Sequence, residues 1–359
     1  FSNSYFTNSF QNHLKLCTVV LVPCRPGLPA NSKGSFLSAM KKYVIRRLLL
    51  LIPVFLGISI IVFTLINLAP GDPYASMLDS SVTVEDREAM LNAIGYYDPL
   101  PVKYVKWLSR AVQGDLGHSI RYREPVVDVL RRRFNNTMLL MVPSLVLSVI
   151  IALPLGVISA TRQYSIFDYI ATILAFLGIS IPAFFLALGL VKFFAYDLGW
   201  FAVSGMQTVG KDLTGIDKIL DTFAHISLPI IVITLVQTAA FMRYTRSAML
   251  EVMQQDYIRT AKGKGLTHRQ VVYEHGFRTA MLPVFTVISI SVGYLVSGAV
   301  LTETVFAWPG MGTLLYQSVA NRDYPLMMGG TFVVAVFVLF SNLFADILYA
   351  RIDPRIRYN

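Results

Sequence analysis

Six long apolar runs constrain this chain more than any other feature. Each run is about 20 residues long, which as an α-helix is enough to cross the roughly 30 Å hydrocarbon core of a bilayer. Of the 359 residues, 55% are hydrophobic and only 14% are charged, a balance that is rare in a soluble chain of this length. The predicted spans lie at about Val44–Leu68, Met138–Ala160, Tyr169–Phe194, Leu228–Tyr244, Val284–Val305 and Met328–Tyr349.

Lysine and arginine residues near the ends of these runs predict the orientation of the chain. They precede the first run at Lys41 and Lys42, crowd the segment between the fourth and fifth runs, and follow the sixth at Arg351 and Arg355. Short cytoplasmic loops carry such an excess, so we expect a multi-pass membrane protein with both termini in the cytoplasm. The net charge of +10 would by itself be compatible with binding of nucleic acid. The basic residues lie at the ends of the spans, however, and this placement argues against a nucleic-acid partner.

The first 39 residues fit none of this pattern. They are rich in Ser and Asn, begin without methionine, and contain an apolar piece, Leu16–Val22, that is too short to span. Met40 followed by two lysines has the form of a natural start, so we expect residues 1–39 to be a non-native or disordered extension. A surface-lying amphipathic anchor is the alternative. The two cysteines, Cys17 and Cys24, form neither a zinc spacing nor a disulfide framework.

The remaining chain divides at the ends of the apolar runs. The longest segment between two spans follows the first run, where Pro and Gly in "APGDP" end the helix. We expect a first transmembrane helix at 40–69, an extracytoplasmic region at 70–136, a five-helix core at 137–350 and a cytoplasmic tail at 351–359.

Glu251–Pro283 is a polar stretch between two apolar runs. Its apolar residues recur at helical spacing and predict one narrow face. These residues are Leu250, Met253, Tyr257 and Ala261. Gly265 is placed to end this helix, because glycine accepts the left-handed conformation of helix ends. Thr267 and Gln270 have the spacing of a capping box that starts a second helix. The pattern predicts helix, turn and helix at the membrane surface, although an ordinary solvated loop is compatible with it.

The residues of this stretch resemble a known element. "DYIRTAKGKGL" at 256–266, followed by His275 and by "LP" at 282–283, resembles the EAA loop of bacterial ABC importer permeases. In those families the loop docks into a cleft on an ATP-binding subunit. Here "RTA" stands where the general family has Glu-Ala-Ala, and the gap from Gly265 to Leu282 is longer. Both departures resemble the peptide-transporter branch.

Other motifs resemble the same branch in the same order. They are "APGDP" at 69–73, "GDLGHS" at 114–119, "SIPAFF" at 180–185, "MRYTRSAMLEV" at 242–252 and "TETVFAWPGMGTLLYQSVANRDYP" at 302–325. Together they resemble the first of the two permease subunits of dipeptide and oligopeptide ABC importers, from Met40 to about Arg357. The resemblance implies an all-α polytopic protein of the bacterial cytoplasmic membrane, with the six-helix ABC type I importer permease fold and an extracytoplasmic insertion after the first helix.

The resemblance also implies partners and site residues. The partners would be a second homologous permease in a heterodimer, two ATP-binding subunits and an extracytoplasmic peptide-binding protein. The phosphate-binding pattern GxxxxGK[ST] is absent, so we expect no catalytic residues and no cofactor on this chain, with ATP and Mg used by the partner subunits. The residues implied in coupling to the ATP-binding subunit are Tyr257, Arg259, Thr260, Ala261, Gly265, Leu266 and His275.

Several charged residues keep two interpretations. Glu303 follows the fifth run. One interpretation places it in the substrate pathway, where it would face the peptide or the binding protein. The other is a solvated helix end. Arg243 and Arg246 suit contact with substrate or partner, but we favour anchoring at the interface, where long basic side chains extend toward water. We interpret Lys192 in the same way.

Three competing functions follow from the sequence. The architecture would also suit an importer of nickel or glutathione, because those transporters resemble this branch. A secondary carrier tends to place ionisable residues near the membrane midplane, and these runs have few. A membrane enzyme lacks support, because no metal pattern or nucleophile constellation stands out; His268, Glu274 and His275 lack metal-ligand spacing.

Overall fold

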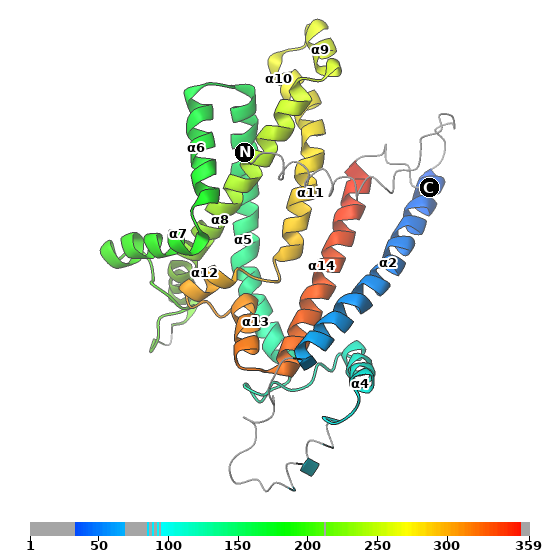
Figure 1. Ribbon diagram of the computed structural model, residues 1–359. Helices are drawn as coiled ribbons and strands as arrows, with labels where there is room; N and C mark the ends of the chain where they lie inside the picture. The colour runs from blue at the N-terminus through cyan, green and yellow to red at the C-terminus, as the bar shows by residue number, and fades with distance from the viewer. Residues whose placement is uncertain are drawn as a thin grey trace, which may run out of the picture.

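The computed structural model describes residues 33–68, 95–211 and 213–352, with the isolated residues Glu85, Glu88, Ala89 and Asn92. These residues are almost entirely helical (Figure 1). The predicted extension up to residue 32 and the "APGDP" motif lie outside the described residues. The first helix begins at Lys33, seven residues before the expected start at Met40.

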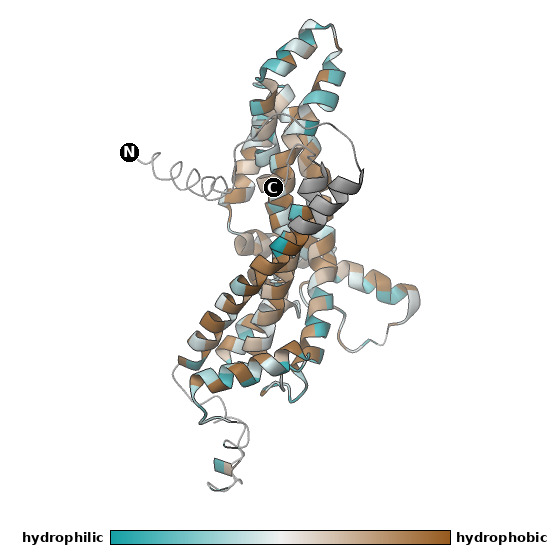
Figure 2. Cartoon of the chain, turned by 90° about the vertical axis from the view of Figure 1, so that its right-hand side faces the viewer, coloured by the Kyte–Doolittle hydropathy of each residue, from teal (hydrophilic) through white to brown (hydrophobic). Residues whose placement is uncertain are grey.

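Among the described residues, five helical stretches are long and apolar enough to cross a membrane. They are the apolar part of α2 (Lys33–Leu68), α5 (Val126–Thr161), α8 (Gly215–Met253), the stretch ending in α11 (Arg278–Tyr294), and α14 (Tyr324–Ile352). Hydrophobic residues dominate the middle of the molecule, and hydrophilic ones gather toward its two ends (Figure 2). This distribution is expected of a membrane protein, because the middle contacts hydrocarbon and the two ends contact water.

The third expected span is not one straight helix. It is divided into α6 (Ile166–Ser180) and α7 (Ala183–Leu190), which continues as the π-helix η1 (Val191–Asp197). The two parts are bent by 103° at the break that contains Pro182. Proline cannot donate a backbone hydrogen bond to the preceding turn and clashes with it. The chain therefore has six spans if the bent pair counts as one.

The fifth expected span also ends early. The helix α11 stops at Tyr294, and α12 (Val300–Val305) is a separate short helix. Between them Gly298 has φ +72°, a left-handed conformation that ends helices and suits glycine. The prediction of one helix from Val284 to Val305 was wrong, because an apolar run does not reveal such a turn.

The core is built around α5 and α8, with α6 packed on α8. Gly156 of α5 meets α8 so closely that a Cβ added to it would lie 2.6 Å from Cβ of Thr245. Gly178 of α6 approaches Ala239 of α8 in the same way, at 2.8 Å. Small residues at helix crossings allow this contact within a membrane.

Two groups of short helices lie at opposite ends of the bundle (Figure 1). At one end are α9 (Asp256–Gly263) and α10 (His268–Gln270), and at the other are α4 (Leu100–Val112) and α13 (Met311–Ala320). The π-helix η2 (Val271–Phe277) connects α10 to α11.

Candidate functional site

The polar stretch forms a helical hairpin that projects beyond the bundle (Figure 1). On one side it follows directly from α8, a helix of 39 residues that starts at the far side of the core. On the other side, η2 runs without a break into α11, so that His268–Tyr294 is a single candidate span. The hairpin is therefore continuous with two spanning helices.

The first of the two helices predicted in this stretch is divided between α8 and α9. Leu250 and Met253 belong to α8, which ends at Met253, whereas Tyr257 and Ala261 belong to α9. The expectation of a single face through all four residues was wrong. The chain turns at Gln254, the C-cap of α8, and Gln255 is the extended N-cap of α9.

A small apolar core holds the hairpin together. Ile258 and Val271 are fully buried and Ala261 is 6% exposed, with Met253 packed against them. Sequence reasoning missed Ile258 and Val271. The signal was present, because Ile258 lies three residues before Ala261 and therefore on the same side of a helix. The small side chain of Ala261 thus serves the packing of α9 on η2 within this chain.

The turn between the two arms has the predicted chemistry. Gly265 follows the C-cap residue Lys264 and has φ +79°, so it occupies the left-handed position that ends a helix. The backbone N–H of Gln270 donates to the Thr267 hydroxyl at 3.4 Å, and the N–H of Thr267 donates to the Gln270 side chain at 3.1 Å. This reciprocal pair is the predicted capping box, which is confirmed.

The other residues implied in coupling lie on the surface of the hairpin. Tyr257 and Leu266 are 43% and 36% exposed, although both are apolar in character. Arg259, Thr260 and His275 are also exposed. Residues 251–283 contain five Lys or Arg and three Asp or Glu, so the surface is mildly basic. Exposed apolar side chains among basic ones are suited to a cleft with an apolar floor and acidic edges.

An ion pair lies two helical turns before the hairpin on α8. The guanidinium of Arg246 donates to the two carboxylate oxygens of Asp168 at 2.9 and 3.0 Å. The hydroxyl of Ser159 and the backbone N–H of Tyr164 also donate to this carboxylate. We expected Arg246 to extend toward water at the interface. Instead it is paired with an almost fully buried acid, which the sequence pattern could not reveal because 78 residues separate the two.

This ion pair connects α8 to the turn between α5 and α6. Asp168 is in the first turn of α6, and Ser159 is near the end of α5. Gly156 contacts α8 at Thr245, next to Arg246, and Gly178 contacts it at Ala239, about two turns further from the hairpin. The three helices therefore pack together, and α8 continues from them into the hairpin.

Glu303 is fully buried among the described residues, so it is not a solvated helix end. Its place in the substrate pathway stays a prediction. Its carboxylate accepts hydrogen bonds from the Thr137 hydroxyl at 3.1 Å and the Thr313 N–H at 2.8 Å, at the N-terminus of α13. Burial raises the pKa of this carboxyl, and these hydrogen bonds oppose the rise.

The loop before α13 is tied to α5 beside Glu303. The indole N–H of Trp308 donates to the carbonyl of Asn136 at 3.0 Å, and the Asn136 amide donates to the carbonyl of Pro309 at 2.9 Å. The Met311 N–H donates to the Thr137 hydroxyl at 2.7 Å. Glu303 thus holds together a rigid corner of α5, α12 and α13. The burial of Trp308 was not predicted from the sequence.

Lys192 is an exposed residue of η1, as an interfacial anchor would be. Its ammonium group contacts the carboxylate of Asp197 and lies 4.9 Å from the centre of the Tyr196 ring. Within the described part of the chain, no three His, Cys, Asp or Glu side chains are grouped closely enough to hold a metal ion.

Several apolar helices long enough to span a bilayer define a multi-pass membrane protein. The model of the binding-protein-dependent transport system inner membrane component matches residues 152–358, and that of its N-terminal region matches residues 40–141. The chain therefore belongs to this family of inner membrane components.

Relatives in several bacteria support the assignment along nearly the whole chain. The oligopeptide transport system permease protein AppB of Bacillus subtilis is 43% identical over 89% of this chain and 100% of its own length. A putative peptide permease protein of Brucella suis is 42% identical over 89% of this chain and 99% of its own. The dipeptide transport system permease protein DppB of Escherichia coli K12 is 38% identical, with the same coverage. The all-helical permease fold inferred from the motifs agrees with these matches.

Proposed function

We propose that this chain is the translocation subunit of an ATP-driven importer of dipeptides or oligopeptides. The projecting hairpin carries the proposal, because it joins two spanning helices to a surface suited to a partner protein. The names of this chain's relatives refer to peptides, oligopeptides and dipeptides, which favours a peptide cargo over nickel or glutathione. A secondary carrier would have no need of this hairpin.

The complete transporter would contain this chain, a second homologous permease, two ATP-binding subunits and an extracytoplasmic peptide-binding protein. ATP and Mg would act in the ATP-binding subunits, and this chain would bind no cofactor. Closure of those subunits on ATP would displace the hairpin docked in a cleft on one of them. The ion pair of Asp168 and Arg246 supports transmission of that displacement to α5, α6 and α8, which would then alternate the access of the peptide path.

The hairpin would lie in the cytoplasm together with both termini. The Lys and Arg residues of the hairpin support this orientation, as do those before the first span and after the last. The corner around Glu303 and the helix α4 would then lie toward the binding protein.

Substitution of exposed hairpin residues tests the coupling role. Tyr257→Ala and Leu266→Ala remove apolar surface without touching the buried core of the hairpin, so the chain should fold normally. We expect them to weaken co-purification of the ATP-binding subunits and to reduce peptide uptake. The matched control is Tyr316→Ala, which removes a tyrosine that is 64% exposed on α13 at the other end of the bundle.

The measurements are pull-down, ATPase activity and uptake of a labelled peptide, all at equal permease levels. If both hairpin variants bind the ATP-binding subunits and transport like the parent, the hairpin is not the coupling element. Cargo is tested separately by competition, in which unlabelled dipeptide should displace the labelled peptide, whereas nickel and glutathione should not.

A further inference from the structure

We propose that Asp346 and Arg47 form a latch between the last and the first spanning helix, which closes and opens during the transport cycle. Asp346 belongs to α14 and Arg47 to α2, and the carboxylate of the one lies 2.7 Å from the guanidinium of the other. Ionisable residues are rare within apolar helices and commonly serve a function there. This role depends on the transport function proposed above, in which Asp346 is a positioning residue that acts through Arg47.

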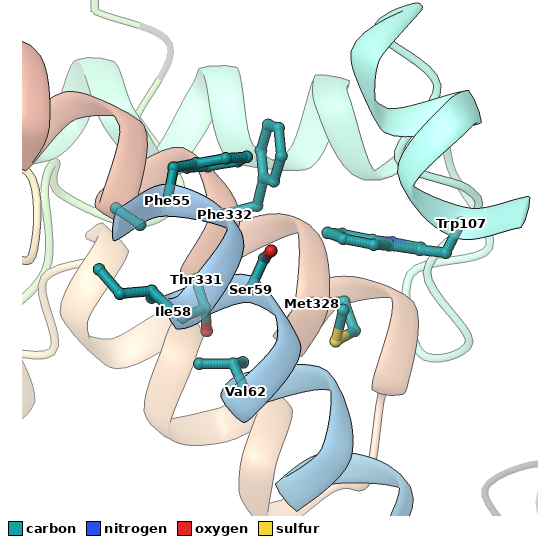
Figure 3. A pocket seen from close by; sticks show the side chains of 9 residues that line it. Phe55, Ile58, Ser59, Val62, Trp107, Met328, Thr331 and Phe332 are labelled. Atoms are coloured by element: carbon teal, nitrogen blue, oxygen red, sulfur yellow. The ribbon is translucent and has the colours of Figure 1, made fainter. Parts of the chain in front are cut away.

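The half of α2 nearer α4 is held firmly. The hydroxyl groups of Ser59 and Tyr104 share a hydrogen bond of 2.7 Å, which connects α2 to α4. The ring of Phe55 packs edge-on against Phe332 of α14, with 5.0 Å between ring centres, and Phe332 packs in the same manner against Trp107 of α4 at 5.6 Å. Figure 3 shows these three rings where the helices meet. This half of α2 is therefore fixed to both α4 and α14.

The other half of α2, toward the end of the bundle that carries the hairpin, is held much less. The two helices lie closest near α4 and separate toward the hairpin end (Figure 1). All six side chains from Ile45 to Leu50 are exposed, so they make little contact with the rest of the described chain. Among the described residues, the pair of Arg47 and Asp346 is the ion pair that joins α2 to α14. The position of this half therefore depends largely on one polar contact.

The latch is built differently from the ion pair of Arg246 and Asp168. The Asp168 carboxylate accepts two N–H groups of Arg246, the Ser159 hydroxyl and a backbone N–H, and its side chain is 5% exposed. The Asp346 carboxylate has a single short contact with Arg47, which is not aligned as a hydrogen bond. The side chains of Asp346 and Arg47 are 28% and 44% exposed.

These differences make the latch reversible. Partly hydrated ion pairs contribute little to stability, whereas a buried and fully hydrogen-bonded pair is costly to break. Water already reaches the Asp346 carboxylate, so separation from Arg47 does not leave a charge without solvation. The hairpin end of α2 then moves about its fixed half, while α5, α6 and α8 stay joined through Asp168.

The first test measures both halves of α2 in the assembled transporter, by double electron–electron resonance in a background without the native cysteines. Nitroxides on Leu49→Cys and Phe344→Cys report the hairpin end of α2 and α14, and those on Leu65→Cys and Val105→Cys report the fixed half of α2 and α4; all four side chains are exposed. Between the nucleotide-free and the vanadate-trapped state, the first distance should change by at least about 5 Å, one helical turn. The second should stay constant.

Two results of this test count against the latch in different ways. An unchanged first distance in a transporter that hydrolyses ATP and imports peptide would overturn the latch alone. A parent complex that neither hydrolyses ATP nor imports peptide would refute the transport function on which the latch depends.

The second test exchanges the two charges. Asp346→Asn and Arg47→Gln each remove the ion pair, so we expect the ATP hydrolysed per peptide imported to rise about two- to fivefold. Combining Arg47→Asp with Asp346→Arg restores a pair of opposite charges and should recover the parental ratio. The matched control is Arg46→Gln, at the neighbouring arginine of α2, which has no acidic partner among the described residues.

Rescue by the exchanged pair separates positioning from a loss of folding, because a protein that is merely destabilised does not regain coupling. A parental ratio in both single variants would overturn the role of Asp346. A ratio as high in the exchanged variant as in the single ones, or as high in Arg46→Gln, would do the same.

Discussion

Arg246 of α8 and Asp168 of α6 form a two-pronged ion pair, with nitrogen–oxygen distances of 2.9 and 3.0 Å. The Asp168 side chain is 5% exposed and that of Arg246 is 26% exposed. Loss of one partner from such a pair leaves the other charge uncompensated in a poorly hydrated place. The pair also connects α8 to the turn between α5 and α6, so it bears on both stability and coupling.

We therefore predict that Arg246→Ala destabilises the protein by roughly 3 kcal/mol, the low end of the range for buried pairs because Arg246 retains some exposure. The thermal midpoint of the transporter, followed by fluorescence-detected gel filtration, measures this loss. Arg132→Ala is the control, since Arg132 pairs with Glu124 at the surface and such pairs contribute about 0–1 kcal/mol. A control variant as unstable as Arg246→Ala would refute the special role of the buried pair.

Replacement by alanine should affect stability differently at Gly263, the last residue of α9, and at Gly265 in the turn that follows. An added Cβ meets open space at both Gly263 and Gly265, but only Gly265 has a positive φ, of +79°. Gly265→Ala should cost roughly 1–2 kcal/mol because the left-handed conformation is strained for other residues. Gly263→Ala, inside α9, should be neutral or stabilising by up to about 1 kcal/mol.

Limited proteolysis of the hairpin, which reports its local opening, distinguishes these two variants. Gly265→Val should open the hairpin further, since a β-branched residue tolerates positive φ poorly. Similar cleavage of Gly263→Ala and Gly265→Ala would contradict the turn geometry.

Ala261 provides a third test of the hairpin. A glutamate at this position would overfill the contact with Val271 and bury a charge, which costs typically 1–3 kcal/mol for the volume alone. We therefore expect Ala261→Glu to loosen the hairpin itself as well as to weaken docking, whereas Arg259→Ala, a change at an exposed side chain, should leave the hairpin closed. Hydrogen exchange of η2 amides separates the two effects. Unchanged exchange in Ala261→Glu would contradict the packing.

Glu303 should make stability depend on pH. Its pKa is raised by burial, so the folded protein holds this proton more tightly than the unfolded chain does. Its contribution to the free energy of unfolding is therefore greatest below the ordinary pKa of glutamate, and it is lost as the pH rises through the raised pKa. Thermal midpoints in a pH series should show this decline in the parent and less of it in Glu303→Gln.

The control for this pH dependence is Glu124→Gln, at a surface glutamate that is 45% exposed. It should keep the parental decline. The same slope in Glu303→Gln and the parent would exclude Glu303 as its source.

The orientation is open to a direct test. Reporter fusions after Asp98 and after Lys264 should give signals from opposite sides of the membrane, since the two sites lie at opposite ends of the bundle. Cytoplasmic activity is expected for the fusion after Lys264. Signals from the same side would refute the proposed topology.

The sequence by itself determined the class of this protein and much of its hairpin. Apolar runs located the spans of α2, α5, α8 and α14, because a bilayer requires long apolar helices whatever their neighbours are. Gly265 and the pair of Thr267 and Gln270 were predicted correctly, because turn and cap preferences act within a few residues of sequence.

Only the tertiary structure decided how the charged residues are used. Arg246 finds Asp168 across 78 residues, and Glu303 finds Thr137 across 166, so no local pattern shows either contact. The bend at Pro182 and the end of α11 at Tyr294 also depend on packing, since proline and glycine are tolerated within many spanning helices. A lipid environment sets which segments are apolar, but the satisfaction of each buried polar group is set by the partners that the fold brings to it.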